Sequence, residues 1–306
     1  MKILVINNIA SGFYDGSVYD FLRTLLQDGD HAVVRCTDGT TTIRSLLTDA
    51  DKFDTVVAAG GDGTVSAVAY HLAFSGIPIL PFPAGTANLL ANNLLSPLEP
   101  HALAKLVRNP RTLDFDLGEI IAEDKHIGFG VMAGAGYDAT IMNAAKPAKK
   151  LLGQMAYFQA AILNALPSKS KIVLDIDDMH IETEGLGILL INFSKIQFDI
   201  TLTHGNEPRD GTFDVVILKA QNAFGLIPAL VAGLLDRDGE FPGRSDSLEI
   251  HRAHEVRAYA DPPMFIQYDG EVPGMQTPFT ARVLNRAARF IVCDDGYEQF
   301  SKSLEQ

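Results

Sequence analysis

Apolar positions in the first third of the chain fall into two alternating patterns. Short runs rich in β-branched residues predict strands at 2–6, 31–35, 56–59 and 77–82. Between them, apolar residues recur at helical spacing, and helices are predicted at 17–27, after residue 64 and from Thr86. Strands that alternate with helices pair in parallel through right-handed crossovers. The pattern therefore predicts an α/β domain with a parallel sheet over residues 1–112.

From residue 112 onward the pattern changes to extended runs separated by Asp, Asn or Gly turns. Such runs occur at 113–122, 127–133, 172–176, 187–193, 213–218, 248–260, 264–267 and 288–293. Closely spaced strands of this kind predict a mainly antiparallel β-sandwich, here over residues 113–293. Residues 294–306 are expected to pack back on the first domain. The expected fold class is α/β plus all-β, with the active site in the cleft between the two domains.

Composition narrows the class of protein. At 306 residues, 47% of them hydrophobic and 21% charged, the chain is long enough for two domains with separate cores. Its net charge of −13 argues against nucleic acid as a partner and against general attraction to anionic membranes. No apolar run reaches the roughly 18 residues of a membrane span, and the N-terminus lacks a signal-peptide layout. We expect a cytoplasmic protein whose membrane contact is local and transient.

A glycine-rich loop, Gly60-Gly61-Asp62-Gly63-Thr64, joins a predicted strand to a predicted helix. The glycines let the backbone come close to a ligand, and the first amides of the helix point toward it, so the loop suits a phosphate. A turn with no ligand is the alternative. Asp62 and Thr64 favour the phosphate site, either through indirect contact with Mg²⁺ or by ordering the loop. The loop is not of the Walker type, because the chain contains no Gly-Lys pair.

Three segments resemble the catalytic domain of diacylglycerol kinases. Residues 60–64 match the GGDGT signature shared with NAD kinases, and residues 81–91 resemble the P-x-GT-x-N-D-F-A segment that NAD kinases do not usually carry. Leu89 replaces the acidic residue common in that segment. Residues 7–12 are similar to the N-P-x-[SA]-G loop of the family, with Ile9 in place of proline. The resemblance implies ATP as the cofactor, bound by Asn8, Ser11, Gly12, Thr37, Gly60, Gly61, Asp62, Gly63, Thr64, Thr86 and Asn88.

Simpler interpretations stay open for two of these positions. The loop at 7–12 fits an ordinary turn, and Thr37 also fits the N-cap of a helix.

Gly134–Ala139 fits a loose GxGxxA pattern, but a dinucleotide fold needs an acid about 20 positions further on. No Asp or Glu lies between Asp138 and Asp175. The segment instead resembles the G-x-G-[FY]-D-A element of lipid kinases.

A basic helix is predicted next. Three lysines within 146–150 precede apolar residues at helical spacing over 151–166. This pattern is typical of a helix that packs on the sandwich with a solvated basic end. The same end would suit anionic lipid headgroups, and the two interpretations are compatible.

Two acidic turns in the second domain resemble motifs of the same family. Arg209–Leu218 resembles D-D-G-x-[FL]-D-[LV], which implies Asp210 as a ligand of a structural Mg²⁺, although Gly205 stands where another acid is expected. Gln267–Val272 resembles the D-G-E motif, which implies a carboxylate that accepts the proton of the acceptor hydroxyl. We assign this role to Glu271, with Asp269 as the main rival and as a Mg²⁺ contact. Taken without the resemblance, both segments fit simple turns.

Together these motifs imply a kinase that uses ATP and Mg²⁺ to phosphorylate the hydroxyl of a diacylglycerol-like lipid at a membrane surface. Phe82, Met132 and Tyr137 are candidates for the apolar wall that contacts the lipid. Two alternatives stay open: an NAD kinase acting on a soluble nucleotide, and a nucleotide-binding protein without catalysis, suggested by the departures from the family motifs. The sequence does not identify the acceptor lipid, and it leaves both a monomer and a homodimer open.

Overall fold

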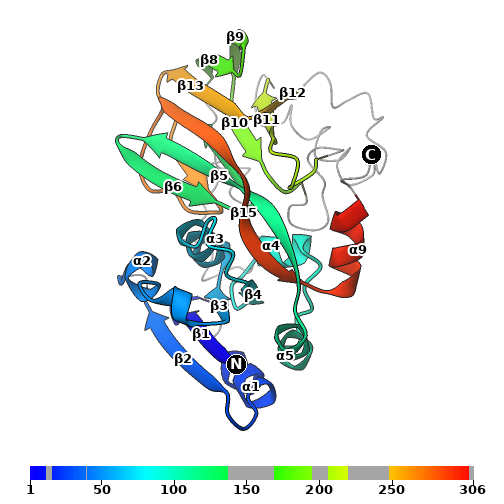
Figure 1. Ribbon diagram of the computed structural model, residues 1–306. Coiled ribbons are helices and arrows are strands. Elements are labelled where there is room, and N and C mark those ends of the chain that lie inside the picture. The colour runs from blue at the N-terminus through cyan, green and yellow to red at the C-terminus, as the bar shows by residue number, and fades with distance from the viewer. Residues whose placement is uncertain (12–15, 39, 137–168, 195–205, 220–247, 303–306) are drawn as a thin grey trace. The chain divides into compact units, whose positions relative to one another are not determined.

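The structure is a computed structural model that describes residues 1–11, 16–38, 40–136, 169–194, 206–219 and 248–302 (Figure 1). The chain divides into two compact units. Unit 1 comprises residues 1–117, 207–211 and 284–306, and unit 2 comprises residues 118–206 and 212–283. The division passes through two long strands, β5 (Arg111–Ala122) and β15 (Phe279–Val292), each of which has residues in both units.

Unit 1 is an α/β domain. Its parallel strands are β1 (Lys2–Asn8), β2 (His31–Thr37), β3 (Thr55–Gly60) and β4 (Ile79–Pro83), in the order β2-β1-β3-β4, and β15 joins β4 in parallel through Phe290. Its helices are α1 (Ser17–Leu25), α2 (Ile43–Leu46), η1 (Ala50–Lys52), α3 (Asp62–His71), α4 (Leu89–Asn93), α5 (Pro100–Arg108) and α9 (Asp294–Lys302).

The apolar face of α1 explains how the helix packs. Val18, Phe21, Leu22 and Leu25 recur at helical spacing, and all four are buried. They share a core cluster with the alternating residues of β1 and β3 and with α5. The rings of Phe21 and Phe82 pack edge to face, with their centroids 5.4 Å apart. Phe82 is therefore a core residue of unit 1, and its expected place in a lipid-contacting wall was wrong.

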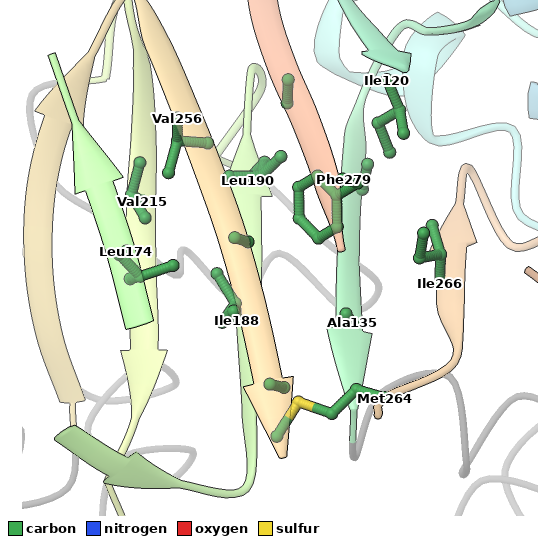
Figure 2. Close-up of a cluster of buried hydrophobic side chains, with 14 of the residues drawn as sticks. Ile120, Ala135, Leu174, Ile188, Leu190, Val215, Val256, Met264, Ile266 and Phe279 are labelled. Carbon is green, nitrogen blue, oxygen red and sulfur yellow. The ribbon is translucent and has the colours of Figure 1, made fainter. Parts of the chain in front are cut away.

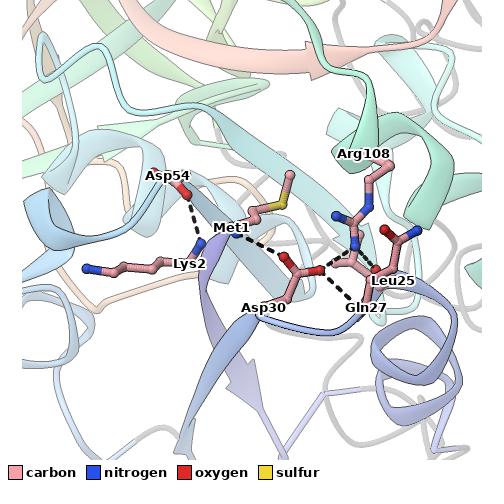
Figure 3. Close-up of polar contacts among 7 residues, drawn as sticks. All are labelled: Met1, Lys2, Leu25, Gln27, Asp30, Asp54 and Arg108. Atoms are coloured by element: carbon pink, nitrogen blue, oxygen red, sulfur yellow. Dashed lines mark hydrogen bonds and ion pairs between the residues drawn. The ribbon is translucent and has the colours of Figure 1, made fainter.

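The carboxylate of Asp30 connects several chain segments at the end of unit 1 where β1 begins (Figure 3). Asp30 accepts hydrogen bonds from the Met1 amine at 2.9 Å, from the Gln27 amide at 2.9 Å and from Arg108 at 2.5 Å. The same Arg108 group also donates to the Leu25 carbonyl at the end of α1. The hydrogen bond from Arg108, followed by that from the terminal amine, holds the pKa of Asp30 well below its ordinary value. Asp30 thus ties α1, α5 and the first strand together.

Unit 2 is a β-sandwich in which the paired strands run antiparallel. One sheet has the order β15-β13-β8-β9, with β5 and β6 (Lys125–Phe129) beside β15; the strands are β8 (Ser170–Ile176), β9 (Met179–Gly185) and β13 (Glu255–Asp261). The other has the order β12-β11-β10-β7-β14, from β7 (Met132–Gly136), β10 (Gly187–Ile191), β11 (Phe213–Leu218), β12 (Leu248–Ala253) and β14 (Ile266–Tyr268).

The core of unit 2 is built from alternate residues of both sheets. Ile120, Leu174, Val256 and Phe279 come from the first sheet, and Ile188, Leu190, Val215 and Ile266 from the second (Figure 2). Because successive side chains of a strand point to opposite faces, this period of two assigns one face of each strand to the core. The cluster joins the two sheets through apolar side chains. It accounts for the sandwich that the extended runs predict.

The two fold classes agree with the sequence analysis, and three details differ. Residues 113–117, 207–211 and 284–293 belong to unit 1, whereas they were expected in the second domain. Two of the expected strands are each divided into two strands that belong to different sheets: the run at 127–133 is β6 and β7, and the run at 248–260 is β12 and β13. The helix expected from Thr86 begins at Leu89. Among the described residues, no helix is long and apolar enough to cross a membrane.

Candidate functional site

The carboxyl ends of the unit 1 strands bring several of the expected site residues together. Asn8 ends β1 and pairs with Thr37 at the end of β2, and Gly60 ends β3 beside β4. Because these strands are parallel, the loops that follow them emerge at the same edge of the sheet, where open α/β sheets bind ligands. The glycine-rich loop and the loop after β4 are neighbours at this edge.

The loop after β1 is hydrogen-bonded to the glycine-rich loop. Asn8 Nδ2 donates to Thr64 Oγ1 at 2.9 Å, and Asn8 Oδ1 accepts from the Ala10 amide at 3.0 Å. The Gly61 amide donates to Ser11 Oγ at 3.4 Å. The structure therefore brings Asn8, Ser11 and Thr64 together as expected, while Gly12 lies outside the described residues.

Two glycines at this edge are required by packing. A Cβ on Gly60 would lie 2.6 Å from Thr64 Cβ, and a Cβ on Gly85 would lie 2.3 Å from Gly61 Cα. Neither distance is tolerated in a folded protein, so a side chain at Gly60 would collide with Thr64 in its own loop, and one at Gly85 would force the loops after β3 and β4 apart. Gly85 therefore allows the loop after β3 and the loop after β4 to touch backbone to backbone, and Gly60 leaves room for the Thr64 side chain.

Gly61 is different, because the fold itself does not require a glycine there. Its φ of −80° and ψ of 178° are open to any residue. Among the described residues, a Cβ on Gly61 would have one neighbour, Gly85 Cα, at 3.8 Å, an ordinary contact. Gly61 is also the N-cap of α3, and no side chain caps it. Among the described residues, the room beside this helix N-terminus, which no side chain caps, fits an anion such as a phosphate.

Asp62 connects the two loops. Its Oδ1 accepts the Leu90 amide at 2.9 Å, so a carboxylate in the first turn of α3 caps the N-terminus of α4. Burial raises the pKa of Asp62, and hydrogen bonds from the amides of Leu90 and Leu89 oppose that shift. The contact shows loop ordering, which is one of the two roles considered for this residue.

The remaining polar residues of these loops shape their own turns. Asn88, at a left-handed φ of 50°, accepts the Gly85 amide at 2.8 Å and donates to the Gly85 carbonyl at 3.1 Å. The buried Thr37 donates its hydroxyl to the Thr41 carbonyl at 3.0 Å. Thr86 is half-buried in the Gly85–Asn88 turn. Asn88 and Thr37 therefore hold loop shape in the structure, and their contact with ATP stays a prediction.

A second buried carboxylate, missed by sequence reasoning, organises residues 207–211. Asp116 accepts the Gly211 amide at 2.7 Å and the Arg286 amide at 2.6 Å, one on each oxygen. Burial raises the pKa of Asp116, and the charge of Asp210 adds to this. The side chain of Arg209 donates to the Asp114 carbonyl and to the Phe300 carbonyl, which ties the segment to α9. The feature of the sequence that could have revealed this role is an acid, Asp116, at a buried position of the mostly apolar strand β5.

The described residues do not assemble a protein cage at the expected structural Mg²⁺ site. The part of the chain that the structure describes contains no group of three or more His, Cys, Asp or Glu side chains able to hold a metal ion. Asp210 has Asp116 as a nearby acid, and both oxygens of Asp116 already accept backbone amides. Gly205 lies outside the described residues. These donors do not fit a dedicated structural site, although Asp210 as a lone ligand stays a prediction.

In unit 2, the acid turn closes on itself after β14. The Tyr268 amide donates to the Glu271 carbonyl at 3.0 Å, and the Glu271 amide donates to the Tyr268 carbonyl at 2.7 Å. Asp269 has a left-handed φ of 42°, a conformation that Asp tolerates better than most residues. The Asp269 amide donates to the Met132 carbonyl at 2.9 Å, which joins the turn to the start of β7.

The two acids of the turn lie in different surroundings. Asp269 accepts three backbone amides: Gly130 at 2.7 Å on Oδ2, and Val131 at 2.9 Å and Met132 at 3.1 Å on Oδ1. Glu271 is exposed, and no described side chain forms an ion pair with it. Burial raises the pKa of Tyr268, and the charges of Glu271 and Asp269 add to the shift. Asp269 therefore holds the 130–132 turn, and Glu271 is open to a ligand.

Other expected positions have structural explanations or lie outside the described residues. Gly136 ends β7 at a φ of 105°, and a Cβ there would lie 2.5 Å from the Leu186 carbonyl oxygen. The glycine is thus needed by the sheet. Met132 is half-buried beside the acid turn. Tyr137 and the predicted helix at 146–166 lie outside the described residues.

Family models match both halves of the chain. Residues 2–120 match the diacylglycerol kinase catalytic domain, and residues 131–292 match the YegS C-terminal NAD kinase beta sandwich-like domain. A probable lipid kinase YegS-like of Pseudomonas fluorescens is 31% identical over 74% of either chain. A diacylglycerol kinase of Bacillus subtilis is 26% identical over 83% of this chain and 85% of its own. An uncharacterized protein of Synechocystis is 26% identical over 78% of this chain, which spans 54% of that protein.

Solved structures share the fold. A putative diacylglycerol kinase from Bacillus anthracis superposes with a TM-score of 0.76 at 20% identity, covering 96% of each chain. An NAD kinase from Archaeoglobus fulgidus, solved in complex with ATP, superposes with a TM-score of 0.56 at 13% identity over 100% of this chain and 99% of its own. At these identities the similarity is one of fold.

Proposed function

Since the chain belongs to the family that joins a diacylglycerol kinase catalytic domain to a YegS C-terminal domain, we propose that it is an ATP-dependent lipid kinase. In this proposal it transfers the γ-phosphate of ATP to the hydroxyl of a diacylglycerol-like lipid. The coarser part, membership of a family of lipid kinases, rests on the matches to both halves of the chain. The finer part, the substrate, rests on the two sites described above.

The space beside Gly61, which would admit a Cβ without a clash among the described residues, carries the proposal. It lies at the N-terminus of α3, whose N-cap residue has no side-chain cap, and the Gly61 amide, which donates to Ser11 Oγ at 3.4 Å, would donate to a phosphate oxygen instead when ATP binds. Asn8, Ser11 and Thr64 surround the loop with hydroxyl and amide groups. We assign the phosphate chain of ATP to this space, because the fold gives no other reason for a glycine at this position.

Glu271 is assigned as the general base. In-line attack of the lipid hydroxyl on the γ-phosphorus forms one P–O bond and breaks the bond to ADP, and the hydroxyl proton passes to the carboxylate of Glu271. An exposed carboxylate is suited to this role because its oxygens are open to a substrate. Asp269 is assigned as a positioning residue, because its carboxylate already accepts three amides.

Mg²⁺ is proposed to arrive with ATP. Mg²⁺ in kinases is commonly held by one or two carboxylates together with substrate phosphates and water, so a protein cage is not needed. When bound, it would offset charge on the phosphate oxygens. Asp210 is the proposed protein ligand, and no step of the transfer above depends on it.

The proposal includes a cytoplasmic protein that meets its substrate at a membrane surface. A diacylglycerol-like lipid resides in a membrane, so access requires at least transient peripheral contact. The basic residues at 146–150, which lie outside the described residues, are the proposed contact. A homodimer stays a prediction that size measurements in solution can test.

A substrate competition assay tests the function. The protein is incubated with radiolabelled ATP and Mg²⁺ in the presence of mixed micelles containing diacylglycerol, and separately with NAD in buffer. We expect label in the lipid and none in NAD. Label in NAD alone would support an NAD kinase, and ATP binding without transfer to either would support a binding protein. The variant Glu271→Gln, which keeps the size of the side chain, is the control for base catalysis.

A further inference from the structure

A buried polar side chain lies on the strand that leads into the acid turn. Gln267, the middle residue of β14, is 2% exposed, and its Nε2 has no hydrogen-bond partner among the described residues. Buried side-chain amides are normally paired, because an unmade hydrogen bond opposes folding. Gln267 therefore needs an explanation that the fold alone does not supply.

The strand pattern places Gln267 away from the core. Ile266 belongs to the core cluster of unit 2 (Figure 2), and Tyr268 packs against that cluster. Successive side chains of a strand alternate between faces, so Gln267 projects from the other face of the β12-β11-β10-β7-β14 sheet. Glu271 follows four residues later, directly beyond the turn.

The cross-strand neighbours of Gln267 on this face are small or apolar. Gln267 pairs with Gly134 of β7, which pairs in turn with Leu189 of β10, and Leu189 pairs with Val216 of β11. Leu189 Cδ2 lies 3.0 Å from the place that a Cβ on Gly134 would take, so the leucine leans over the glycine. The carboxamide is thus the polar group at the end of an apolar row.

We propose that Gln267 determines substrate specificity by donating a hydrogen bond to an ester carbonyl oxygen of the acceptor lipid. This inference rests on the proposed lipid kinase function. An unpaired N–H donor at the end of an apolar row calls for a ligand that is apolar apart from an acceptor oxygen. An acyl ester next to a free hydroxyl has this chemistry, and an ammonium group, which only donates, does not.

The test compares two acceptors that differ only at the carbonyls. One is an ester-linked diacylglycerol, and the other is its ether-linked dialkylglycerol analogue of the same chain length, each presented in mixed micelles. The enzyme variants are wild type, Gln267→Leu, Gln267→Met and, as a matched control, Gln276→Leu. Gln276 is a half-buried glutamine that forms a bridge with Phe265 just before β14.

We expect wild type and Gln276→Leu to prefer the ester by roughly tenfold in kcat/KM, the size of one hydrogen bond. Gln267→Leu and Gln267→Met should lose this preference through a slower reaction with the ester, with the ether rate unchanged. Their Tm should equal or exceed that of wild type, because removing an unpaired buried amide does not weaken the fold.

Three outcomes would overturn the inference, and they are distinguishable. An unchanged ester preference in both Gln267 variants would mean that the amide does not contact the carbonyl. A fall in Tm in both variants would mean that the amide is paired within the fold. If wild type phosphorylates neither acceptor, the proposed function itself fails, and the inference fails with it.

Discussion

The substitution Gly61→Ala separates the needs of the fold from those of the ligand. The backbone conformation at Gly61 suits alanine, and the added Cβ would lie 3.8 Å from Gly85 Cα. Losing glycine stabilises by about 0.4 to 1 kcal/mol through the unfolded chain. Placing alanine at a helix N-cap costs about 0.5 to 1 kcal/mol relative to glycine. These terms offset each other, so we expect little change in the free energy of unfolding.

Nucleotide binding should respond very differently. The methyl group would occupy the space into which a phosphate oxygen must come to reach the Gly61 amide. Losing one charge-assisted hydrogen bond costs about 1.5 to 3 kcal/mol, which is roughly 10- to 150-fold in Kd. Isothermal titration calorimetry with ATP and Mg²⁺ measures the affinity, and thermal unfolding of the same samples measures the stability.

Gly85→Ala is the matched control, because the same methyl group there meets backbone. Its Cβ would lie 2.3 Å from Gly61 Cα, so the loops must separate and Tm should fall. If Gly61→Ala binds ATP with wild-type affinity at an unchanged Tm, the phosphates do not occupy this space. A Gly61→Ala protein with a Tm as low as that of Gly85→Ala would show that the glycine is structural after all.

Further predictions concern the acids. Glu271→Gln should lower kcat by about 100-fold or more with Tm unchanged, as expected for loss of a general base, and steady-state kinetics with a Tm measurement check it. Asp269→Asn should lower Tm, because one amide oxygen cannot replace a carboxylate that accepts three amides, whereas full kcat with an unchanged Tm would contradict the positioning role. Asp30→Asn should lower Tm at pH 7. The folded-state pKa of Asp30 is depressed, so the stability that its carboxylate contributes is present above the unfolded value of 3.8 and is lost as pH falls. The difference in Tm between wild type and Asp30→Asn should therefore shrink between pH 7 and pH 3. Asp116→Asn should reduce the loss of stability that accompanies a rise in pH, because burial raises the pKa of Asp116 and its ionisation opposes folding as pH rises through that pKa. An unchanged slope of Tm against pH between pH 4 and 7 would refute this.

Local patterns made much of the fold predictable. The face of α1 and the apolar strands of unit 1 follow periods of 3.6 and two, and these residues pack as the periods require. The run at 248–260 was different, because a period of two continues through the break between β12 and β13. That break is fixed by Asp177, which accepts the amides of His254 and Glu255 from 77 and 78 residues away. No local pattern reveals such a contact.

The site was predictable as a set of motifs and less so as a set of roles. The glycine-rich loop and its neighbour at Gly85 could be found from sequence, because a cluster of glycines marks close backbone approach. Sequence did not show that Asp62 caps α4 from α3, or that Asp269 holds the amides of residues 130–132. These roles depend on which chain segments the fold brings together, and the type of residue alone does not reveal them.

A crystal structure with Mg²⁺ and a non-hydrolysable ATP analogue would show whether the Gly60–Thr64 loop binds the phosphates of ATP. We expect a phosphate oxygen within hydrogen-bonding distance of the Gly61 amide, at the N-terminus of α3. A nucleotide whose phosphates lie away from the Gly60–Thr64 loop, while the loop keeps the conformation described above, would contradict it.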